Sequence, residues 1–447
     1  MTSPIHFYWP AALLLLVPSL SVAQWERPSS VGASESAPVL YVDSGSNSPI
    51  RAAALNGDID KLSITAASTT SGYGDVGKAL IARAHGDFTG SARLAADCVD
   101  HAMAAGGGGA SIALVCAEIG ASNVLMRGDQ KGWAQATIDS WNRLAPALRA
   151  ATGQTHLSTS ELDIARAVLS GAPETKTSIQ WRPTRQPLRF LPDPAKITAP
   201  GERLFVEVEV NGKVQHWMLD TGVQTSALSR ADAASLGLPV TEAHIRARDP
   251  SGRSVSTVGL VDVDQLNVAG LEVKHARMLV VPGDVSLLGM DLLARMGSVT
   301  RISSKAVSFD ASPGRCDSPL TYKLDFTGLQ DDSGVLMSPS IAGEQRLASL
   351  DLGNNSALAL ASSDLSWRKG STPVQVRVTK VTGESTMEVL QGKVDVSANG
   401  TTATVPLSIV DPDGSSPPWT VGSGILHQFD VVLDHSRHTA CLWPAAK

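Results

Sequence analysis

The stretch that decides the fold is LFVEVEVNGKVQHWMLDTGVQTSALS, residues 204–229. Apolar and polar residues alternate over 204–210, Asn211-Gly212 follows, and an apolar-rich run returns over 214–219. Alternation is the pattern of a half-buried strand, and Asn-Gly between two such runs is a strong signal for a tight hairpin turn. The stretch therefore predicts a β-hairpin whose second strand leads directly into Asp220-Thr221-Gly222.

Further motifs follow this tripeptide in a fixed order. They are Asp249-Pro250-Ser251-Gly252, Leu287-Leu288-Gly289, Met290-Asp291-Leu292-Leu293 and Val307-Ser308-Phe309. A strand feeding Asp-Thr-Gly, a flap tip, a bracing hydrophobic-hydrophobic-Gly motif, a short helix and a closing strand together resemble one lobe of the retropepsin-like and pepsin-like aspartic proteases. The resemblance implies that residues 201–315 form such a lobe, with Asp220 as a catalytic residue.

The same resemblance implies roles for neighbouring residues. Thr221, Gly222 and Thr225 would support the catalytic loop, and Ser251 with Gly252 would form the flap tip. In this family the threonine hydroxyl bonds across to the opposite catalytic loop.

A second copy of the pattern lies 131 residues further on. Residues 204–210 correspond to 335–341, Leu219–Gly222 corresponds to Leu350–Gly353, and Gly252 corresponds to Gly383. Asp351 therefore takes the place of Asp220. A tandem of this kind resembles the two-lobed, pepsin-like arrangement, which implies a second lobe at 333–447 after an inter-lobe segment at 316–332.

Two aspartates at matching places point to a specific chemistry. Carboxylates about 3 Å apart cannot both ionise, so they share one proton and titrate as a pair. The charged carboxylate can then take a proton from water while the neutral carboxyl binds the scissile carbonyl. In the second copy Gly353 and Ser356 would support the loop, but Leu352 replaces the threonine. We expect half of the cross-lobe lock to be missing.

The region before these copies has a different pattern. Residues 24–170 contain Ala-rich segments with helical spacing, separated by Asn56-Gly57-Asp58, His85-Gly86-Asp87 and Arg127-Gly128-Asp129. Glycine ends a helix in a left-handed conformation and aspartate caps the next. These "Gly-Asp turns" predict a helical-hairpin region that resembles tetratricopeptide-like stacks. Its role stays open between partner docking, a propiece and structural packing.

Two other segments complete the organisation. Residues 1–23 contain an apolar run followed by Ser21-Val22-Ala23, the pattern of a cleaved secretory signal peptide. The sequence predicts an exported protein, periplasmic or secreted, with no membrane span in the mature chain. Proline is dense over 171–200, which predicts a linker that breaks both helix and sheet.

The four cysteines, Cys98, Cys116, Cys316 and Cys441, predict two disulfides in an oxidising compartment. Three pairings are possible, and free thiols are the alternative. Cys98–Cys116 and Cys316–Cys441 are favoured because each pair lies in its own region. The resemblance to two-lobed proteases also implies that Cys316 and Cys441 meet in a sheet shared by the lobes.

Several other functions are disfavoured. The net charge of −6 and the lack of any basic run give no footprint for nucleic acid. Metal-ligand spacings are lacking, and no nucleophile motif of the Gly-x-Ser-x-Gly type occurs, so no cofactor is predicted. Asp291 is interpreted as a helix cap, and His427, His435 and His438 as surface residues on strand and turn.

The fold class that follows is multidomain, with an all-α helical-hairpin region followed by an all-β, two-lobed, aspartic-protease-like barrel pair. The leading hypothesis for function is an exported aspartic endopeptidase acting on peptides or unfolded protein. The alternative, prompted by Leu352, is a protease-like protein that binds extended peptides without cutting them, with the helical region as a partner-docking module. A version in which Asp220 pairs with its copy in a second chain also stays open.

Overall fold

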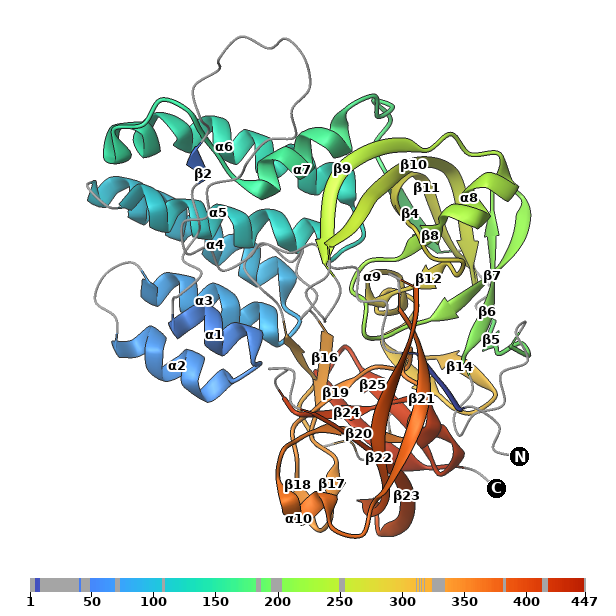
Figure 1. The fold of residues 1–447 in the computed structure, drawn as a ribbon. Helices are drawn as coiled ribbons and strands as arrows, with labels where there is room; N and C mark the ends of the chain where they lie inside the picture. Colours follow the sequence, from blue (N-terminus) through green and yellow to red (C-terminus); the bar gives the residue numbers. More distant parts are fainter. Residues whose placement is uncertain are drawn as a thin grey trace.

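The structure is a computed structural model (Figure 1). It describes residues 5–8, 40–41, 49–68, 73–106, 109–181, 186–193, 203–248, 254–310, 312, 314, 316, 318–323, 334–380, 383–411 and 417–445. Helices dominate the first part of the described chain and strands the rest, which confirms the predicted change from helical to strand periodicity.

The helices form a layered stack in which each helix contacts the next (Figure 1). The helices are α1 Pro49–Leu55, α2 Ile59–Ser68, α3 Tyr73–Ala84, α4 Phe88–Ala105, α5 Gly109–Leu125, α6 Gln130–Thr152 and α7 Ser160–Leu169. We call α1 to α7 the helical stack. A short parallel pairing of β2 (Leu40–Tyr41) with β3 (Leu157–Ser158) lies beside it. No helix in the described residues is long and apolar enough to cross a membrane.

The Gly-Asp turns join successive helices of the stack. Gly86 and Gly128 both have φ of +77°, the left-handed region in which a side chain is strained. Asp87 accepts a hydrogen bond from Gly90 N at 2.7 Å, and Asp129 accepts one from Gly132 N at 2.8 Å. These contacts satisfy backbone amides at the starts of α4 and α6. They confirm the prediction that glycine ends one helix and aspartate caps the next.

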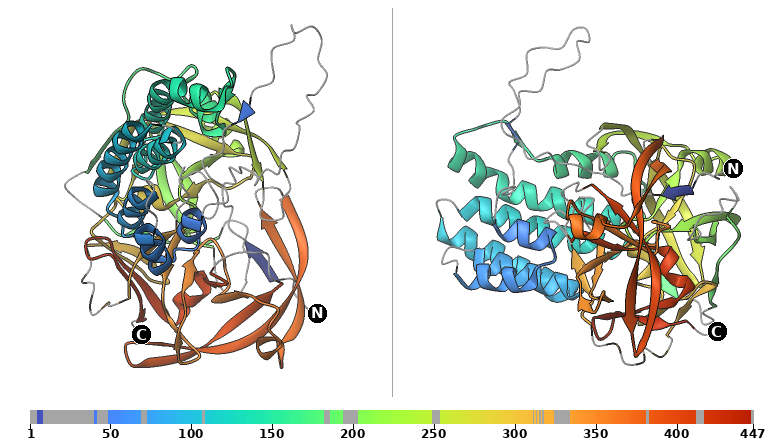
Figure 2. Two further views of the ribbon diagram at one scale, coloured as in Figure 1. Left: turned by 90° about the vertical axis from the view of Figure 1, so that its left-hand side faces the viewer. Right: turned by 60° about the horizontal axis from the view of Figure 1, so that its bottom comes forward.

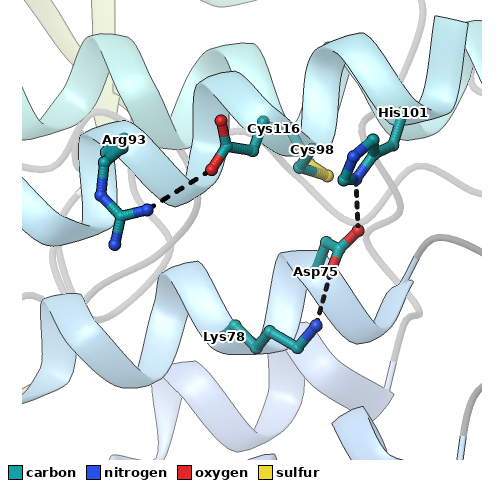
Figure 3. Close-up of polar contacts among 7 residues, drawn as sticks. Asp75, Lys78, Arg93, Cys98, His101 and Cys116 are labelled. Atoms are coloured by element: carbon teal, nitrogen blue, oxygen red, sulfur yellow. Dashed lines mark hydrogen bonds and ion pairs between the residues drawn. A yellow bond between two sulfur atoms is a disulfide. The ribbon is translucent and has the colours of Figure 1, made fainter.

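Cross-links between helices hold the stack together (Figure 3). Cys98 on α4 and Cys116 on α5 form a disulfide, as predicted. On the exposed side, Asp75 of α3 accepts hydrogen bonds from Lys78 at 2.8 Å and contacts His101 of α4 at 3.2 Å. The stack is therefore a covalently tied layer with a core of small aliphatic side chains.

Among the described residues, six strands close into a barrel. These are β6 Phe205–Val210, β7 Lys213–Leu219, β8 Ala227–Ser229, β10 Ser254–Val268, β11 Leu271–Val281 and β12 Leu287–Leu288. The pairings run β11–β8–β12–β7–β6–β10, and β10 pairs with β11 to complete the ring. The predicted hairpin is β6–β7, with Val210 opposite Lys213 across the Asn-Gly turn.

Other elements surround this first barrel. They are β9 Thr241–Arg248, α8 Arg230–Leu236, α9 Met290–Leu293, β4 Ser178–Trp181 and β5 Leu188–Arg189. β9 extends the β10 edge and β4 pairs with β11. The expectation that residues 171–200 break every sheet is wrong at β4 and β5, because both sit between the prolines and pair at sheet edges, where a missing amide is tolerated.

A second sheet follows in the chain. Its strands are β15 Thr321–Lys323, β16 Gly334–Met337, β17 Ser340–Ile341, β18 Glu344–Gln345, β19 Ala348–Leu350, β20 Leu358–Ala361, β21 Thr372–Lys380, β22 Gly383–Ala398, β23 Thr401–Val410 and β24 Trp419–Val421. Its pairings run β23–β20–β24–β19–β16, and β17 pairs with β22, which pairs with β23. This order follows that of the first barrel strand by strand.

A third sheet joins the two β regions. It contains β13 Val299–Ile302, β14 Ala306–Phe309, β25 Phe429–Asp434 and β26 Thr439–Pro444, in the order β26–β25–β13–β14–β5. Cys316 and Cys441 are bonded here, which confirms the second predicted pair. β26 and β25 come from the end of the chain, whereas β13 and β14 follow the first barrel, so the sheet and the disulfide tie the two regions together.

The remaining elements are short. α10 (Leu365–Arg368) lies beside β21, η1 (Ser423–His427) follows β24, and β1 (Ile5–Tyr8) pairs in parallel with β21. Apart from Ile5–Tyr8, the predicted signal peptide at 1–23 lies outside the described residues. Figure 2 shows the helical stack alongside both β regions, with α1 and α2 near the second sheet and α7 near the first barrel.

Candidate active site

Asp220 stands at the point where β7 ends inside the first barrel. β7 pairs in parallel with β12, and Asp220 N donates to Leu288 O at 3.0 Å, so the Leu287-Leu288 motif fixes the start of the loop. The Asp220 carboxylate accepts a hydrogen bond from Gly222 N at 2.9 Å. The whole residue is shielded from solvent.

Asp351 stands at the corresponding end of β19. β19 pairs in parallel with β24, and Asp351 N donates to Val421 O at 2.9 Å. Its carboxylate accepts a bond from Asn354 N at 3.2 Å. The two aspartates therefore leave their sheets by the same backbone route. We call residues 220–226 the first Asp loop and residues 351–357 the second Asp loop.

The two carboxyl groups are brought together. Both are buried, and they face the same point of the first loop: a Cβ on Gly222 would lie 3.1 Å from Asp220 Oδ1 and 2.7 Å from Asp351 Oδ1. A Cβ on Gly353 would lie 2.6 Å from both Asp220 carboxylate oxygens. Each glycine thus lets its loop backbone approach the opposite carboxylate, which no larger residue would allow.

Burial changes the acid strength of both groups. It raises the pKa of Asp220 to about 6, although the bond from Gly222 N opposes the rise. Burial raises the pKa of Asp351 well above its usual range, and the neighbouring charge of Asp220 raises it further. One proton shared between the groups is the state that two close carboxyls favour. Asp220 Oδ2 has no hydrogen-bond partner among the described residues.

Thr221 links the two loops. Its hydroxyl donates to Leu350 O at 3.1 Å and accepts from Leu352 N at 2.9 Å, so one side chain bonds to the backbone on both sides of Asp351. Leu352 is buried and has no hydroxyl to return the contact. The cross-loop lock is therefore one-sided.

The predicted support residues lie around these aspartates. Thr225 is half-buried and packs against Gly289, where a Cβ would lie 3.0 Å from Thr225 C. Ser356 N and Oγ both donate to Asn354 Oδ1, at 3.0 and 2.7 Å. Gly289 and Asn354 thereby shape the two turns that follow the aspartates.

The predicted flap residues are placed only in part. Ser251 and Gly252 lie outside the described residues. Gly383 begins β22 and pairs with Lys380 of β21. The strands that would carry the two flaps, β9–β10 and β21–β22, are long antiparallel pairs.

Asp291 is a residue whose role the sequence did not reveal. α9 starts at Met290 with Gly289 at its N-cap position, so the interpretation of Asp291 as a helix cap is wrong. Its Oδ1 instead accepts bonds from Ser226 N at 2.9 Å and Ser226 Oγ at 2.7 Å. Burial raises the pKa of Asp291 to about 6, against the effect of these bonds. A lone carboxylate within the apolar run 287–293 was the available signal.

The C-terminal histidines differ from expectation at one position. His435 is half-buried: its Nδ1 lies 3.2 Å from the Tyr322 hydroxyl, and burial of the ring lowers its pKa to about 4. Within the described residues, no group of three or more His, Cys, Asp or Glu side chains could hold a metal ion.

Comparison with known proteins found one family model that matches the part of the chain carrying the first Asp loop. The family model described as aspartyl protease matches residues 206–292. This segment includes the first Asp loop, the bracing Leu287-Leu288-Gly289 motif and α9 as far as Leu292. No curated protein matches the chain. The match, together with the closed barrel, supports an aspartic-protease-like family and a peptidase-type enzyme. The matched segment ends well before Asp351.

Proposed function

We propose that this chain is an exported aspartic endopeptidase in which Asp220 and Asp351 together activate water. The single observation that carries the proposal is the close, buried pair of carboxyls at the ends of β7 and β19. The proposed architecture is a pair of lobes, at 201–315 and 333–447, behind a tetratricopeptide-like helical region at 24–170. The matching order of strand pairings in the two β regions supports the paired lobes.

The proposed reaction uses one proton shared by the dyad. The charged carboxylate takes a proton from water while the water oxygen bonds to the scissile carbonyl carbon, and the neutral carboxyl donates to the carbonyl oxygen. When the C–N bond of this gem-diol breaks, the amine nitrogen takes one proton from the dyad, and one gem-diol hydroxyl returns its proton to the dyad as the new C=O bond forms. The products are a carboxylic acid and an amine, and the dyad again holds one proton.

The raised pKa values suggest that the pair keeps one proton. Burial raises the pKa of both carboxyls, so the dyad holds a single shared proton and a single negative charge. Asp220 Oδ2, buried and unpartnered among the described residues, is the acceptor available to the attacking water. Below pH 6 both carboxyls become protonated and the base is lost. We therefore expect the rate of cleavage to rise as the pH rises through about 6.

The export proposal rests on the disulfides. Within the described part of the chain every cysteine is bonded, and such bonds persist in oxidising compartments. Removal of residues 1–23 would then give the mature protein.

The proposal is tested with the purified chain starting at residue 24. Incubated with a peptide library, it should produce internal cleavages detected by mass spectrometry. Asp220→Asn should reduce the rate by about 10²–10⁴-fold or more, because the amide cannot act as a base. Circular dichroism and thermal unfolding should show that the variant is folded. Cleavage by folded Asp220→Asn at the wild-type rate would refute the proposal.

Leu352 is the observation that favours a second candidate. A site with a one-sided lock could hold an extended peptide by strand pairing without cutting it. Against this, Leu352 is buried without disturbing its own N–H bond to Thr221, so the loops stay joined. A tightly bound peptide that stays intact over a long incubation would favour the binding protein.

A further inference from the structure

We propose that the helical stack holds the two Asp loops in their relative position, and we call it the strap in this role. The glycines of its Gly-Asp turns pack against both β regions, the first around the first barrel and the second around the second sheet. The inference rests on the proposed function, because it assigns the stack a positioning role at the same site. Figures 1 and 2 show the stack extending along both β regions, from the second sheet to the first barrel.

Two of the turns face the second β region. Gly57, between α1 and α2, has φ of +63°, and a Cβ there would overlap Leu336 Cδ1 of β16. Gly86, between α3 and α4, lies against β15 of the second sheet and against the β25–β26 turn of the third sheet. A Cβ there would be 3.1 Å from His438 Nδ1 and 3.2 Å from Tyr322 Cε2. The backbone of both turns thus touches the second region directly.

The third turn faces the first β region. A Cβ on Gly128, between α5 and α6, would lie 3.5 Å from Arg295 Nη1, 3.7 Å from Ile179 Cδ1 and 3.8 Å from Asp291 O. The turns therefore share one edge of the stack, and this edge spans both β regions.

Each end of the edge contacts a residue that is joined to an Asp loop or to the strand leading into it. Gly128 lies against Asp291, whose carboxylate holds Ser226 of the first Asp loop. Gly57 lies against Leu336, which pairs with Ser349, two residues before Asp351. A displacement of the stack would therefore reach both loops through packed, buried groups.

Side chains also form contacts between the stack and the β regions. The Phe88 ring at the start of α4 meets the buried Tyr322 ring edge-on, with centroids 5.5 Å apart. Arg277 of β11 is buried and donates to Ser170 O at the end of α7, 2.9 Å away. α7 also contacts β9 of the first barrel. Packed contacts of this kind transmit position better than a mobile linker does.

The one-sided lock explains why a second element would be needed to hold the loops in position. The Thr221 side chain ties the loops directly, whereas the Leu352 side chain has no hydroxyl to form a reciprocal bond. A threonine hydroxyl at position 352 would restrict the relative movement of the two loops, and this hydroxyl is missing. A rigid element fixed to both β regions would restrict the same movement in its place. The strap thus acts on orientation of the dyad, and its loss should lower kcat more than it raises KM.

The chain offers a matched control. Gly57, Gly86 and Gly153 all have left-handed φ, of +63°, +77° and +69°. Alanine is strained at each of them by a similar amount. Gly153 ends α6, and a Cβ there would meet nothing within 4 Å. The difference between Gly57→Ala or Gly86→Ala and Gly153→Ala therefore isolates contact with the second β region.

The experiment measures peptide cleavage and hydrogen exchange of full-length mature variants well below their unfolding temperatures. We expect kcat to fall by about 10-fold for Gly57→Ala, since a misplacement near 1 Å can cost up to about 100-fold. The kcat of Gly86→Ala should fall less, because the added Cβ would lie further from its neighbours than in Gly57→Ala. The kcat of Gly153→Ala should equal that of the wild type. Exchange of the Leu350 and Asp351 amides should rise in the same order.

Equal kcat and equal exchange for Gly57→Ala, Gly86→Ala and Gly153→Ala would overturn the strap. If Gly57→Ala does not fold, Gly86→Ala against Gly153→Ala decides the question in the same way. If the wild type cleaves nothing, the proposed function fails, whereas exchange at residues 350–351 still shows whether the stack holds the second Asp loop.

Discussion

The first and second Asp loops follow the same backbone route but are held by different side chains. In the first loop, Thr221 reaches across to the other loop, and Ser226 is tied to Asp291, 65 residues away in the chain. In the second loop, Asn354 bonds to Ser356 within the same turn. The Thr221 and Ser226 side chains of the first loop thus bond outside their own loop, whereas the Asn354–Ser356 contact stays within the second.

This difference shows which features the paired site requires. Both aspartates end a strand that pairs in parallel with a bracing strand, β7 with β12 and β19 with β24. Both loops also keep the glycine that approaches the opposite carboxylate. The backbone route and the close approach are common to both loops, whereas the hydroxyl and the bracing carboxylate occur in one loop only.

The largest effect is expected from the disulfides. Cys316–Cys441 closes 125 residues and Cys98–Cys116 closes 18, so chain entropy predicts losses of about 5 and about 3 kcal/mol on removal. Urea unfolding of the double alanine variants measures both. Loss of Cys316–Cys441 should also loosen the second Asp loop and lower cleavage. A Cys98–Cys116 variant that lowers cleavage more than the other would contradict this account.

Thr221→Val tests the one-sided lock. Removing the hydroxyl leaves Leu350 O and Leu352 N without this buried partner, which should cost about 2–4 kcal/mol of unfolding free energy. Thr225→Val on the same loop is the control, because Thr225 takes no part in the lock. If the two variants lose the same stability and activity, Thr221 does not join the loops.

Asp291→Asn tests the brace on the first loop through its pH dependence. Burial raises the folded-state pKa from 3.8 to about 6, so the stability that Asp291 contributes is complete below about pH 4 and lost as the pH rises through 6. The wild type should therefore lose up to about 3 kcal/mol relative to Asp291→Asn between pH 4 and pH 7. A relative gain over this range would mean that the bonds from Ser226 outweigh burial.

Leu352→Thr should have the smallest effect, because it adds one hydroxyl to a packed position. A reciprocal bond to the first loop would stabilise the protein by about 0.5–1.5 kcal/mol and make the two loops more alike. Differential scanning calorimetry can resolve this. The same substitution made with Thr221→Val should restore part of the lost stability. A destabilised Leu352→Thr would show that the second loop has no acceptor within reach.

Much of the fold could be predicted because it depends on local patterns. Period-two alternation and Asn211-Gly212 predicted the β6–β7 hairpin, and the Gly-Asp turns predicted where helices stop and start. The shift of 131 residues between the two copies predicted that Asp351 takes the place of Asp220. The hairpin and the turns were predictable because strand pairing and helix caps use residues close together in the sequence.

What could not be predicted depends on contacts between distant residues. Asp291 looked like a helix cap, and only the packing of α9 against the first Asp loop turns its carboxylate toward Ser226. His435 looked exposed, and only the approach of Tyr322 buries its ring. The strands within residues 171–200 form because β11 and β14 offer free edges, which local proline content does not reveal.

The most direct test of the paired site is the cleavage rate of Asp351→Asn, because Asp351 lies outside the segment that matches the aspartyl protease family. We predict a loss of at least about 100-fold in kcat/KM, equal to that of Asp220→Asn, in a folded protein. Asp291→Asn, which also replaces a buried carboxylate but leaves the dyad intact, should keep most of its activity. Cleavage by folded Asp351→Asn at the wild-type rate would contradict a site shared between the two loops.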